Sequence, residues 1–202
     1  NIIAAPGYPE LISNMVSLNN DRRNTAFVIG DTSMRLAATS TAIQNWASNS
    51  AADTGNSEDG LVTADEYLGV FYPQGQTNDL SGNTIVVPAS HMILRTIARS
   101  DDQSFPWFAP AGTRRGLVDN ANAIGFINSA TGEFQVDNVR ESLRDTLYSN
   151  RVNPITFFNG VGLMNYGQKT RAATTSSLDR INVARLANYL RSQLQATALG
   201  FV

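Results

Sequence analysis

Thr25-Ala26-Phe27-Val28-Ile29 is a short apolar run that ends at Gly30-Asp31, and a longer segment at residues 33–48 follows it directly. An apolar run bounded in this way is typical of a buried β-strand that ends in a loop. In residues 33–48 the apolar side chains recur at roughly helical spacing, which predicts a helix. A strand that leads straight into a helix is the basic unit of a layered α/β fold.

Apolar runs elsewhere in the chain repeat this signal. Residues 67–72 and 155–158 predict two more buried strands, and residues 161–166 predict a short fourth strand. Residues 49–60 and 74–83 are polar and contain glycine, so we expect both to be surface loops.

Two helices are predicted between these strands. Pro88 suits the first position of a helix, where its missing N–H would have no partner, and this helix runs to Arg99. Its expected buried face consists of Met92, Ile93, Ile97 and Ala98. A second helix is predicted from apolar residues spaced 3-4-4 along one face. These residues are Val136, Val139, Leu143 and Leu147.

The last part of the chain predicts a long amphipathic helix, with Ser176 and Ser177 as candidate N-cap residues. Its apolar residues repeat at helical spacing, so this face should lie on an apolar surface. They are Val183, Ala187, Leu190, Leu194, Ala198 and Phe201. Residues 101–122, rich in Pro, Gly, Asp and Arg, predict a long ordered excursion of the kind that usually carries function.

Together these segments predict an α/β fold in three layers, with helices flanking a mainly parallel or mixed sheet. A length of 202 residues fits one large domain, so we expect a single α/β domain over residues 1–202. The hydrophobic fraction of 42% is that of an ordinary globular domain. No apolar run approaches the ~18 residues that a bilayer span requires, so we expect no membrane insertion.

The composition excludes several kinds of chemistry. The chain has no cysteine and one histidine, His91, which excludes disulfides, thiol catalysis and histidine-rich metal sites. Fifteen basic and 17 acidic residues give a net charge of −2, so we expect no binding of nucleic acid. Fourteen of the basic residues are arginine, which favours contacts with other protein surfaces.

Three short motifs offer alternatives. Gly162, Gly167 and then Gln168-Lys169-Thr170 approach a phosphate-binding loop but contain one residue too many, so a glycine-rich hairpin is the preferred interpretation. Asp53-Thr54-Gly55 matches an aspartic-protease tripeptide but lies in a polar loop without a second copy. His91 follows Ser90 and is expected to make local hydrogen bonds. We therefore expect no catalytic, cofactor or metal site.

One set of motifs is more specific than composition. Residues 86–91 read Val-Val-Pro-Ala-Ser-His, residues 98–101 read Ala-Arg-Ser-Asp, and residues 106–112 read Pro-Trp-Phe-Ala-Pro-Ala-Gly. This pattern resembles the tail sheath protein of contractile-tailed bacteriophages, most of all the T4-like type. Ala5-Pro6-Gly7, and residues 152–155, 160–170 and 180–186, agree in order, so the resemblance spans nearly the whole chain.

The resemblance implies a structural subunit and no enzyme. Such subunits form stacked six-fold rings around the tail tube and contract to drive the tube through the host envelope during genome delivery. The implied partners are other copies of the chain, the tail tube protein, and the baseplate and tail terminator proteins. The implied location is the virion tail, and the host cytoplasm during assembly. The chain would be the core domain of the sheath protein, without its N- and C-terminal arms.

Two other functions stay open, a small α/β nucleotide-binding enzyme that uses Lys169 and the sheath of a pyocin-like injection machine. Candidate subunit-interface residues lie in the long excursion and on the last helix, where the arginines are expected to be exposed. They are Trp107, Arg114, Arg115, Arg180, Arg185 and Arg191. The alternative for Trp107 is that it packs the excursion onto its own sheet.

Overall fold

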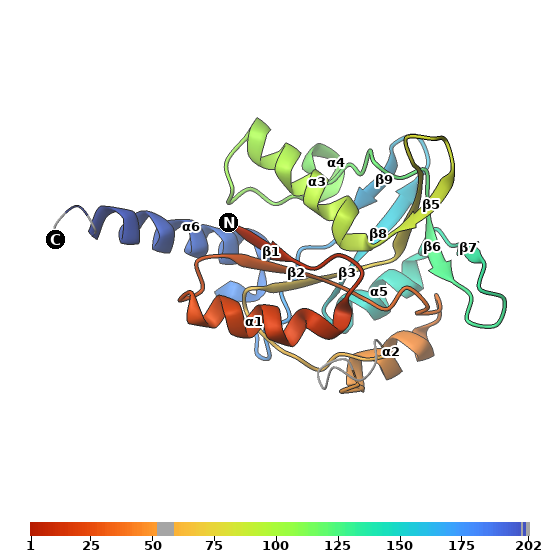
Figure 1. Ribbon diagram of the computed structural model, residues 1–202, viewed down its shortest axis with the longest axis horizontal. Helices are drawn as coiled ribbons and strands as arrows, with labels where there is room; N and C mark the ends of the chain where they lie inside the picture. Colours follow the sequence, from red (N-terminus) through yellow and green to blue (C-terminus); the bar gives the residue numbers. More distant parts are fainter. Residues whose placement is uncertain (52–58, 199, 201–202) are drawn as a thin grey trace.

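A five-stranded sheet of order β1-β2-β3-β8-β9 forms the centre of the computed structural model, which describes residues 1–51, 59–198 and 200 (Figure 1). The strands β1, β2, β3 and β8 run parallel, and β9 returns antiparallel to β8. All residues of β2 and β3 are buried, as in parallel sheets covered on both faces. The bounds are β1 (Ile2–Ala4), β2 (Phe27–Asp31), β3 (Leu68–Tyr72), β8 (Val152–Phe158) and β9 (Gly162–Asn165).

Helices cover both faces of this sheet. In Figure 1, α1 (Ile12–Asp21), α2 (Ser40–Ser48) and α5 (Glu141–Ser149) lie below the sheet, and α3 (Ala89–Gln103) lies above it. The approach of α1 is close, because a Cβ atom on Gly30 would lie only 2.6 Å from Cδ1 of Ile12. The predicted three-layer α/β arrangement is thus confirmed.

A second, antiparallel sheet of order β5-β4-β6-β7 lies beside the main one. It consists of β4 (Gln74–Asn78), β5 (Thr84–Val87), β6 (Ala123–Ile127) and β7 (Phe134–Val136). The prediction of a loop over residues 74–83 is therefore wrong at its start. Gln74 is fully buried, and both ends of its side-chain amide are hydrogen-bonded. Its Nε2 donates to the carbonyl of Thr32 (3.1 Å), and its Oε1 accepts from the backbone N–H of Ala89 (2.9 Å). These side-chain bonds allow a polar residue to begin β4 in a buried position, while the strand becomes exposed toward Asn78.

The first two predicted helices exist, but with different ends. The predicted helix at 33–48 begins only at Ser40, because the Thr39 hydroxyl caps it by accepting from the Ala42 N–H (3.2 Å). In α3, Pro88 is the residue before the helix, and the helix continues past Arg99 to Gln103. Ala98 is exposed, so its assignment to the buried face of α3 is wrong.

The predicted helix at 136–147 is correct only in its second half. Val136 belongs to β7 and is 56% exposed, and Val139 lies between β7 and α5 with a φ of 53°. Leu143 and Leu147 are the members of the set that line the buried face of α5. The four residues have helical spacing in the sequence, but only Leu143 and Leu147 lie in the same helix. Among the helices and strands of the described residues, β1, β5, β6, β7, α1 and α4 (Gly112–Arg115) were not predicted.

The last helix, α6, runs over Ile181–Ala198, and its outer part projects away from the sheet (Figure 1). Ser176 caps a short 3-10 helix (Ser177–Asp179) before it. The buried residues of α6 are Ile181, Ala184, Arg185 and Asn188. The predicted apolar face is largely outside the core, since Leu190 is 50% and Leu194 is 69% exposed. Phe201, the end of that face, lies outside the described residues.

Candidate subunit interface

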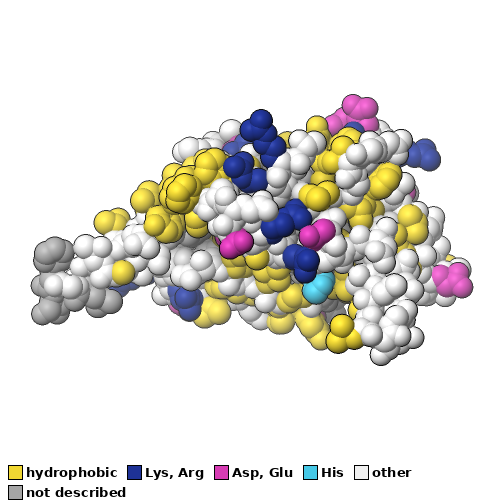
Figure 2. Space-filling model, turned by 90° about the horizontal axis from the view of Figure 1, so that it is seen from above, with side chains coloured by type: hydrophobic (Ala, Val, Ile, Leu, Met, Phe, Trp, Pro, Cys, Tyr) yellow, Lys and Arg dark blue, Asp and Glu magenta, His cyan; other side chains and the backbone are white. Residues whose placement is uncertain are grey.

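Four aromatic side chains meet on the surface where the loop between α3 and α4 (Gly112–Arg115) contacts α6. Trp107 stacks on Phe105 with ring centroids 4.8 Å apart and planes 2° apart, and Phe105 also lies 6.2 Å from Phe108. Trp107 contacts Tyr189 of α6 at 5.2 Å. Phe105, Phe108 and Tyr189 are all exposed. We name these four residues the aromatic surface, and Figure 2 shows apolar side chains gathered beside the projecting α6.

The predicted residues of the long excursion fall on or beside this surface. The Trp107 ring contacts Tyr189 and thereby joins its loop to α6. The Arg115 guanidinium lies 4.3 Å from the centre of the Phe108 ring, and its Nε donates to the Ser104 hydroxyl (3.2 Å). Arg114 is exposed in the short helix α4. Phe105, Phe108 and Tyr189 were not among the predicted residues, although three aromatic residues within a Pro- and Gly-rich loop are a usable signal in the sequence.

The arginines near α6 mostly contact their own chain. The expectation that Arg185 is exposed is wrong, because its side chain is 6% exposed and its Nη2 binds the carboxylate of Asp101. Burial is possible because Asp101 balances its charge. Arg191 covers the Tyr67 ring at 4.8 Å. Arg180, with 43% of its side chain exposed, donates from Nη1 to the Tyr148 hydroxyl (2.6 Å).

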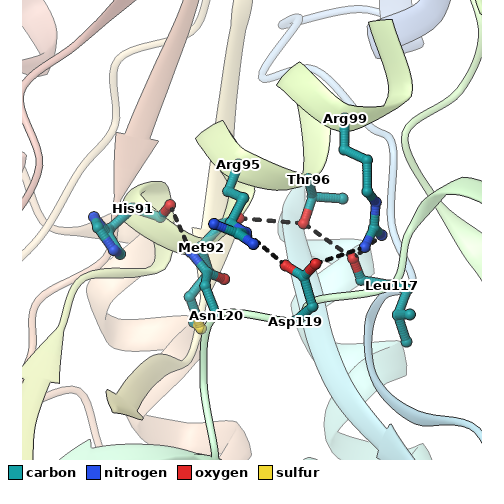
Figure 3. A network of polar contacts seen from close by, with 8 residues as sticks. All are labelled: His91, Met92, Arg95, Thr96, Arg99, Leu117, Asp119 and Asn120. Carbon is teal, nitrogen blue, oxygen red and sulfur yellow. Dashed lines mark hydrogen bonds and ion pairs between the residues drawn. The ribbon is translucent and has the colours of Figure 1, made fainter. Parts of the chain in front are cut away.

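The long excursion is fixed to the outer face of α3 by a polar network (Figure 3). The Asp119 carboxylate accepts from Arg95 Nε (2.8 Å) and from Arg99 Nη1 (3.0 Å). The hydrogen bond from Arg95 and the nearby positive charges hold the pKa of Asp119 below its usual value. Arg99 also donates to the Leu117 carbonyl. The excursion is thus an ordered part of the surface.

Lys169 has a structural role in place of a phosphate-binding one. Its Nζ donates to the Tyr148 carbonyl (3.0 Å) near the end of α5 and lies 4.0 Å from the centre of the Tyr148 ring. A cation at this end of a helix is favourable. Burial is the main cause that lowers the pKa of Lys169, followed by Arg151 and Arg180. No helix begins directly after Lys169, so the helix N-terminus that a phosphate-binding loop needs is missing there.

The other chemical motifs give no catalytic arrangement in the described part of the chain. The Ser90 hydroxyl donates to the buried Asp31 carboxylate (2.7 Å), while His91 is exposed. Burial raises the pKa of Asp31, and hydrogen bonds from Gly7 and Ser90 oppose this shift. Residues 53–55 lie outside the described residues. Within residues 1–51, 59–198 and 200 we find no cluster of three metal-ligating side chains and no helix suited to crossing a membrane.

The fold of the whole chain is that of contractile-sheath proteins. It matches the anti-feeding prophage helical sheath in its contracted state with a TM-score of 0.69 at 16% identity, covering 100% of this chain and 47% of that chain. The contracted sheath complex of an extracellular contractile injection system, PVC, gives a TM-score of 0.67 at 19% identity, covering 96% of this chain and 46% of that one. A baseplate structure of the anti-feeding prophage gives 0.70 at 16% identity, covering 100% and 46%.

Sequence comparison is more specific. Over about half its length the chain is a homologue of the tail sheath proteins of two phages. It is 37% identical to that of Vibrio phage KVP40 over 112 residues, which are 55% of this chain and 15% of the relative. It is 35% identical to that of Enterobacteria phage T4 over 108 residues, 54% of this chain and 15% of the relative. The matches thus span a small part of these relatives. No protein-family model matches the chain.

Proposed function

We propose that this chain is part of a structural subunit of a contractile tail sheath, with no enzymatic activity. The observation that carries the proposal is the agreement of two independent comparisons. The full chain has the fold of a contracted sheath, and half of it is homologous to phage tail sheath proteins. The homology favours a phage tail over a pyocin-like machine.

The structure supports a rigid body that works by changing its contacts. Its two central strands are wholly buried, and an ordered network fixes its longest excursion. Head-to-tail contacts between such bodies that do not close on themselves produce a helix. Contraction would then be a change between two packings of rigid bodies of different free energy. The exposed aromatic surface and Arg114 are the contacts that we assign to such packing.

The finer parts of the proposal concern assembly and partners. The subunits would form stacked six-fold rings around a tail tube in the virion, after assembly in the host cytoplasm. Contraction would drive the tube through the host envelope. The similarity to a baseplate structure supports contacts with baseplate proteins. Contacts with the tube and the tail terminator protein follow from the same proposed role.

Negative-stain electron microscopy of the full-length protein, expressed alone, tests the proposal. We expect hollow cylinders, because the sheath contacts lie between identical copies. A protein that stays monomeric at all concentrations would contradict the proposal. A thermal-unfolding scan with ATP and magnesium tests the nucleotide-binding alternative. A ligand at 100 times its Kd would stabilise the fold by about 2.7 kcal/mol, and we expect no such shift.

A further inference from the structure

The turn between β4 and β5 presents a leucine that its own chain does not cover. Leu80 is 109% exposed, the largest value among the exposed large apolar side chains of the described residues. A single exposed apolar side chain needs no explanation by itself. This one differs from the others because the turn that carries it is held in a fixed conformation by its own polar groups.

Asp79 holds the turn together. Its carboxylate accepts from the backbone N–H of Ser81 (2.8 Å) and from the backbone N–H (2.8 Å) and side chain (3.0 Å) of Asn83. The Asp79 N–H donates to the Asn83 carbonyl (2.8 Å), and Gly82 takes a φ of 85°, which glycine adopts without strain. The turn is therefore ordered before any partner arrives, so covering Leu80 loses little conformational entropy.

The aromatic surface can receive an apolar side chain of this kind. Its rings support one another, since Phe105 stacks on Trp107 and Trp107 contacts Tyr189. Phe105 and Phe108 are nevertheless 57% and 37% exposed, and the Arg115 guanidinium lies over the Phe108 ring. Clustered aromatic side chains bordered by arginine have the composition of the residues that dominate binding at protein interfaces.

The turn and the aromatic surface carry opposite charges. Residues 77–84, which form the turn and the adjoining ends of β4 and β5, contain Asp79 and no basic residue. Residues 104–116, which hold three of the four aromatic side chains, contain Arg114 and Arg115 and no acidic residue. Arg114 is exposed. Complementary charges of this kind favour encounter and fix the register of two surfaces.

The two features lie on opposite sides of one molecule. The longest axis of the molecule is horizontal in Figure 1, where the loop after α3 lies toward the left, beside α6, and the turn between β4 and β5 lies at the upper right. One chain therefore does not place its own turn on its own aromatic surface. A contact between the two features joins two copies head to tail and leaves one of each feature free, so it can repeat along an open assembly.

We propose that Leu80 of one copy packs on the aromatic surface of a second copy, with Asp79 facing Arg114 and Arg115. The choice of a second copy rests on the proposed function, which requires a head-to-tail contact that does not close on itself. The opposite charges and the opposite positions of the two features meet that requirement.

Photo-crosslinking of the full-length protein identifies what covers Leu80. p-Benzoylphenylalanine replaces Leu80, a mixture of ¹⁵N-labelled and unlabelled protein is irradiated, and the cross-linked peptides are identified by mass spectrometry. We expect cross-links to residues 104–116 that join labelled to unlabelled copies. The matched control carries the same group in place of Leu18, an exposed leucine of α1, and should not reach residues 104–116. Cross-links from position 80 to other segments alone, or none, would overturn the proposal.

Charge substitutions test the pairing itself, with the critical concentration for cylinder formation as the readout. Leu80→Lys places a cation opposite two arginines and should raise this concentration by about tenfold or more, the effect of losing one buried leucine contact. Leu80→Asp loses the same contact but keeps the attraction, so its effect should be smaller. Arg114→Glu should weaken assembly alone and partly restore it in Leu80→Lys, whereas Leu18→Lys should match the unmodified protein. Equal effects of lysine and aspartate at position 80, or no recovery in the double variant, would refute the pairing.

Failure of this contact is distinct from failure of the proposed function. Cylinders that form equally well with Leu80→Lys would overturn the contact and leave the proposed function intact. A full-length protein that never forms cylinders would contradict the proposed function. Cross-links from position 80 to residues 104–116 would support the contact even then, and their absence would overturn both.

Discussion

The buried carboxylate of Asp31 joins three separate parts of the chain, and its removal tests how the core is held together. It lies at the end of β2 and accepts from the Gly7 N–H (2.9 Å), the Ser90 N–H (2.6 Å) and the Ser90 hydroxyl (2.7 Å). It thereby fixes the loop after β1 to the start of α3. Asp31→Ala leaves these three donors without their acceptor.

The expected loss follows from the two donors of Ser90, which are fully buried. At about 1–2 kcal/mol for each unsatisfied buried donor, Asp31→Ala should lower the free energy of unfolding by about 3 kcal/mol. With a urea dependence of about 2 kcal/mol per molar, the unfolding midpoint falls by about 1.5 M. Relief of the cost of burying a carboxylate acts in the opposite direction, so this is an upper estimate.

The assay is urea unfolding followed by circular dichroism, with Asp79→Ala as the matched control. Asp79 also accepts three hydrogen bonds, from the Ser81 N–H and from the backbone and side chain of Asn83, but it lies at the surface. Water can replace those bonds, so its midpoint should stay close to that of the unmodified chain. Equal midpoints for the two variants would refute the role assigned to Asp31.

Three further predictions concern charge and binding. Burial raises the pKa of Asp31 above 3.8, so between 3.8 and the raised value the folded chain holds a proton that the unfolded chain has lost. The contribution of Asp31 to stability therefore increases as pH falls through this window, and Asp31→Asn should abolish that increase in urea midpoints measured across acidic pH. Asp119→Ala should cost no more than about 1 kcal/mol, because its pairs with Arg95 and Arg99 are both accessible to solvent. The loss should shrink in high salt, which screens such pairs. A larger loss that does not depend on salt would contradict this. Lys169→Met removes the cation at the C-terminal end of α5 and should lower the free energy of unfolding by about 0.3–1 kcal/mol. ATP should change the melting temperature of neither the variant nor the unmodified chain. A shift with ATP that the unmodified chain shows and the variant loses would restore the nucleotide-binding alternative.

Elements with long apolar runs could be predicted from the sequence, and short or polar ones could not. β2 and β3 were predicted from mostly apolar runs that are buried on both faces, and the predicted run at 155–158 forms the second half of β8. β4 begins with Gln74, whose burial depends on bonds to Thr32 and Ala89 that are distant in sequence. β1 has three residues and is defined by its pairing with β2. Such elements depend on tertiary contacts and not on local propensity.

Helical spacing correctly predicted α6, but it did not predict which side of the helix is buried. Two overlapping stripes exist on this helix. The leucine-containing stripe that the periodicity indicated includes the exposed Leu190 and Leu194, whereas Arg185 and Asn188 lie on the buried side. Arg185 can be buried because its guanidinium pairs with the carboxylate of Asp101 in α3. This partner is 84 positions away along the chain, so the spacing within α6 does not reveal it.

A cryo-electron microscopy map of the assembly that the full-length protein forms tests the central claim most directly. We expect this fold to repeat along a helix as the outer layer, with Phe105, Phe108 and Arg114 buried between neighbouring copies. A cylinder in which these side chains face solvent would contradict the assigned interface. A particle in which this fold is absent from the outer layer of the tail would contradict the claim that the chain belongs to a sheath subunit.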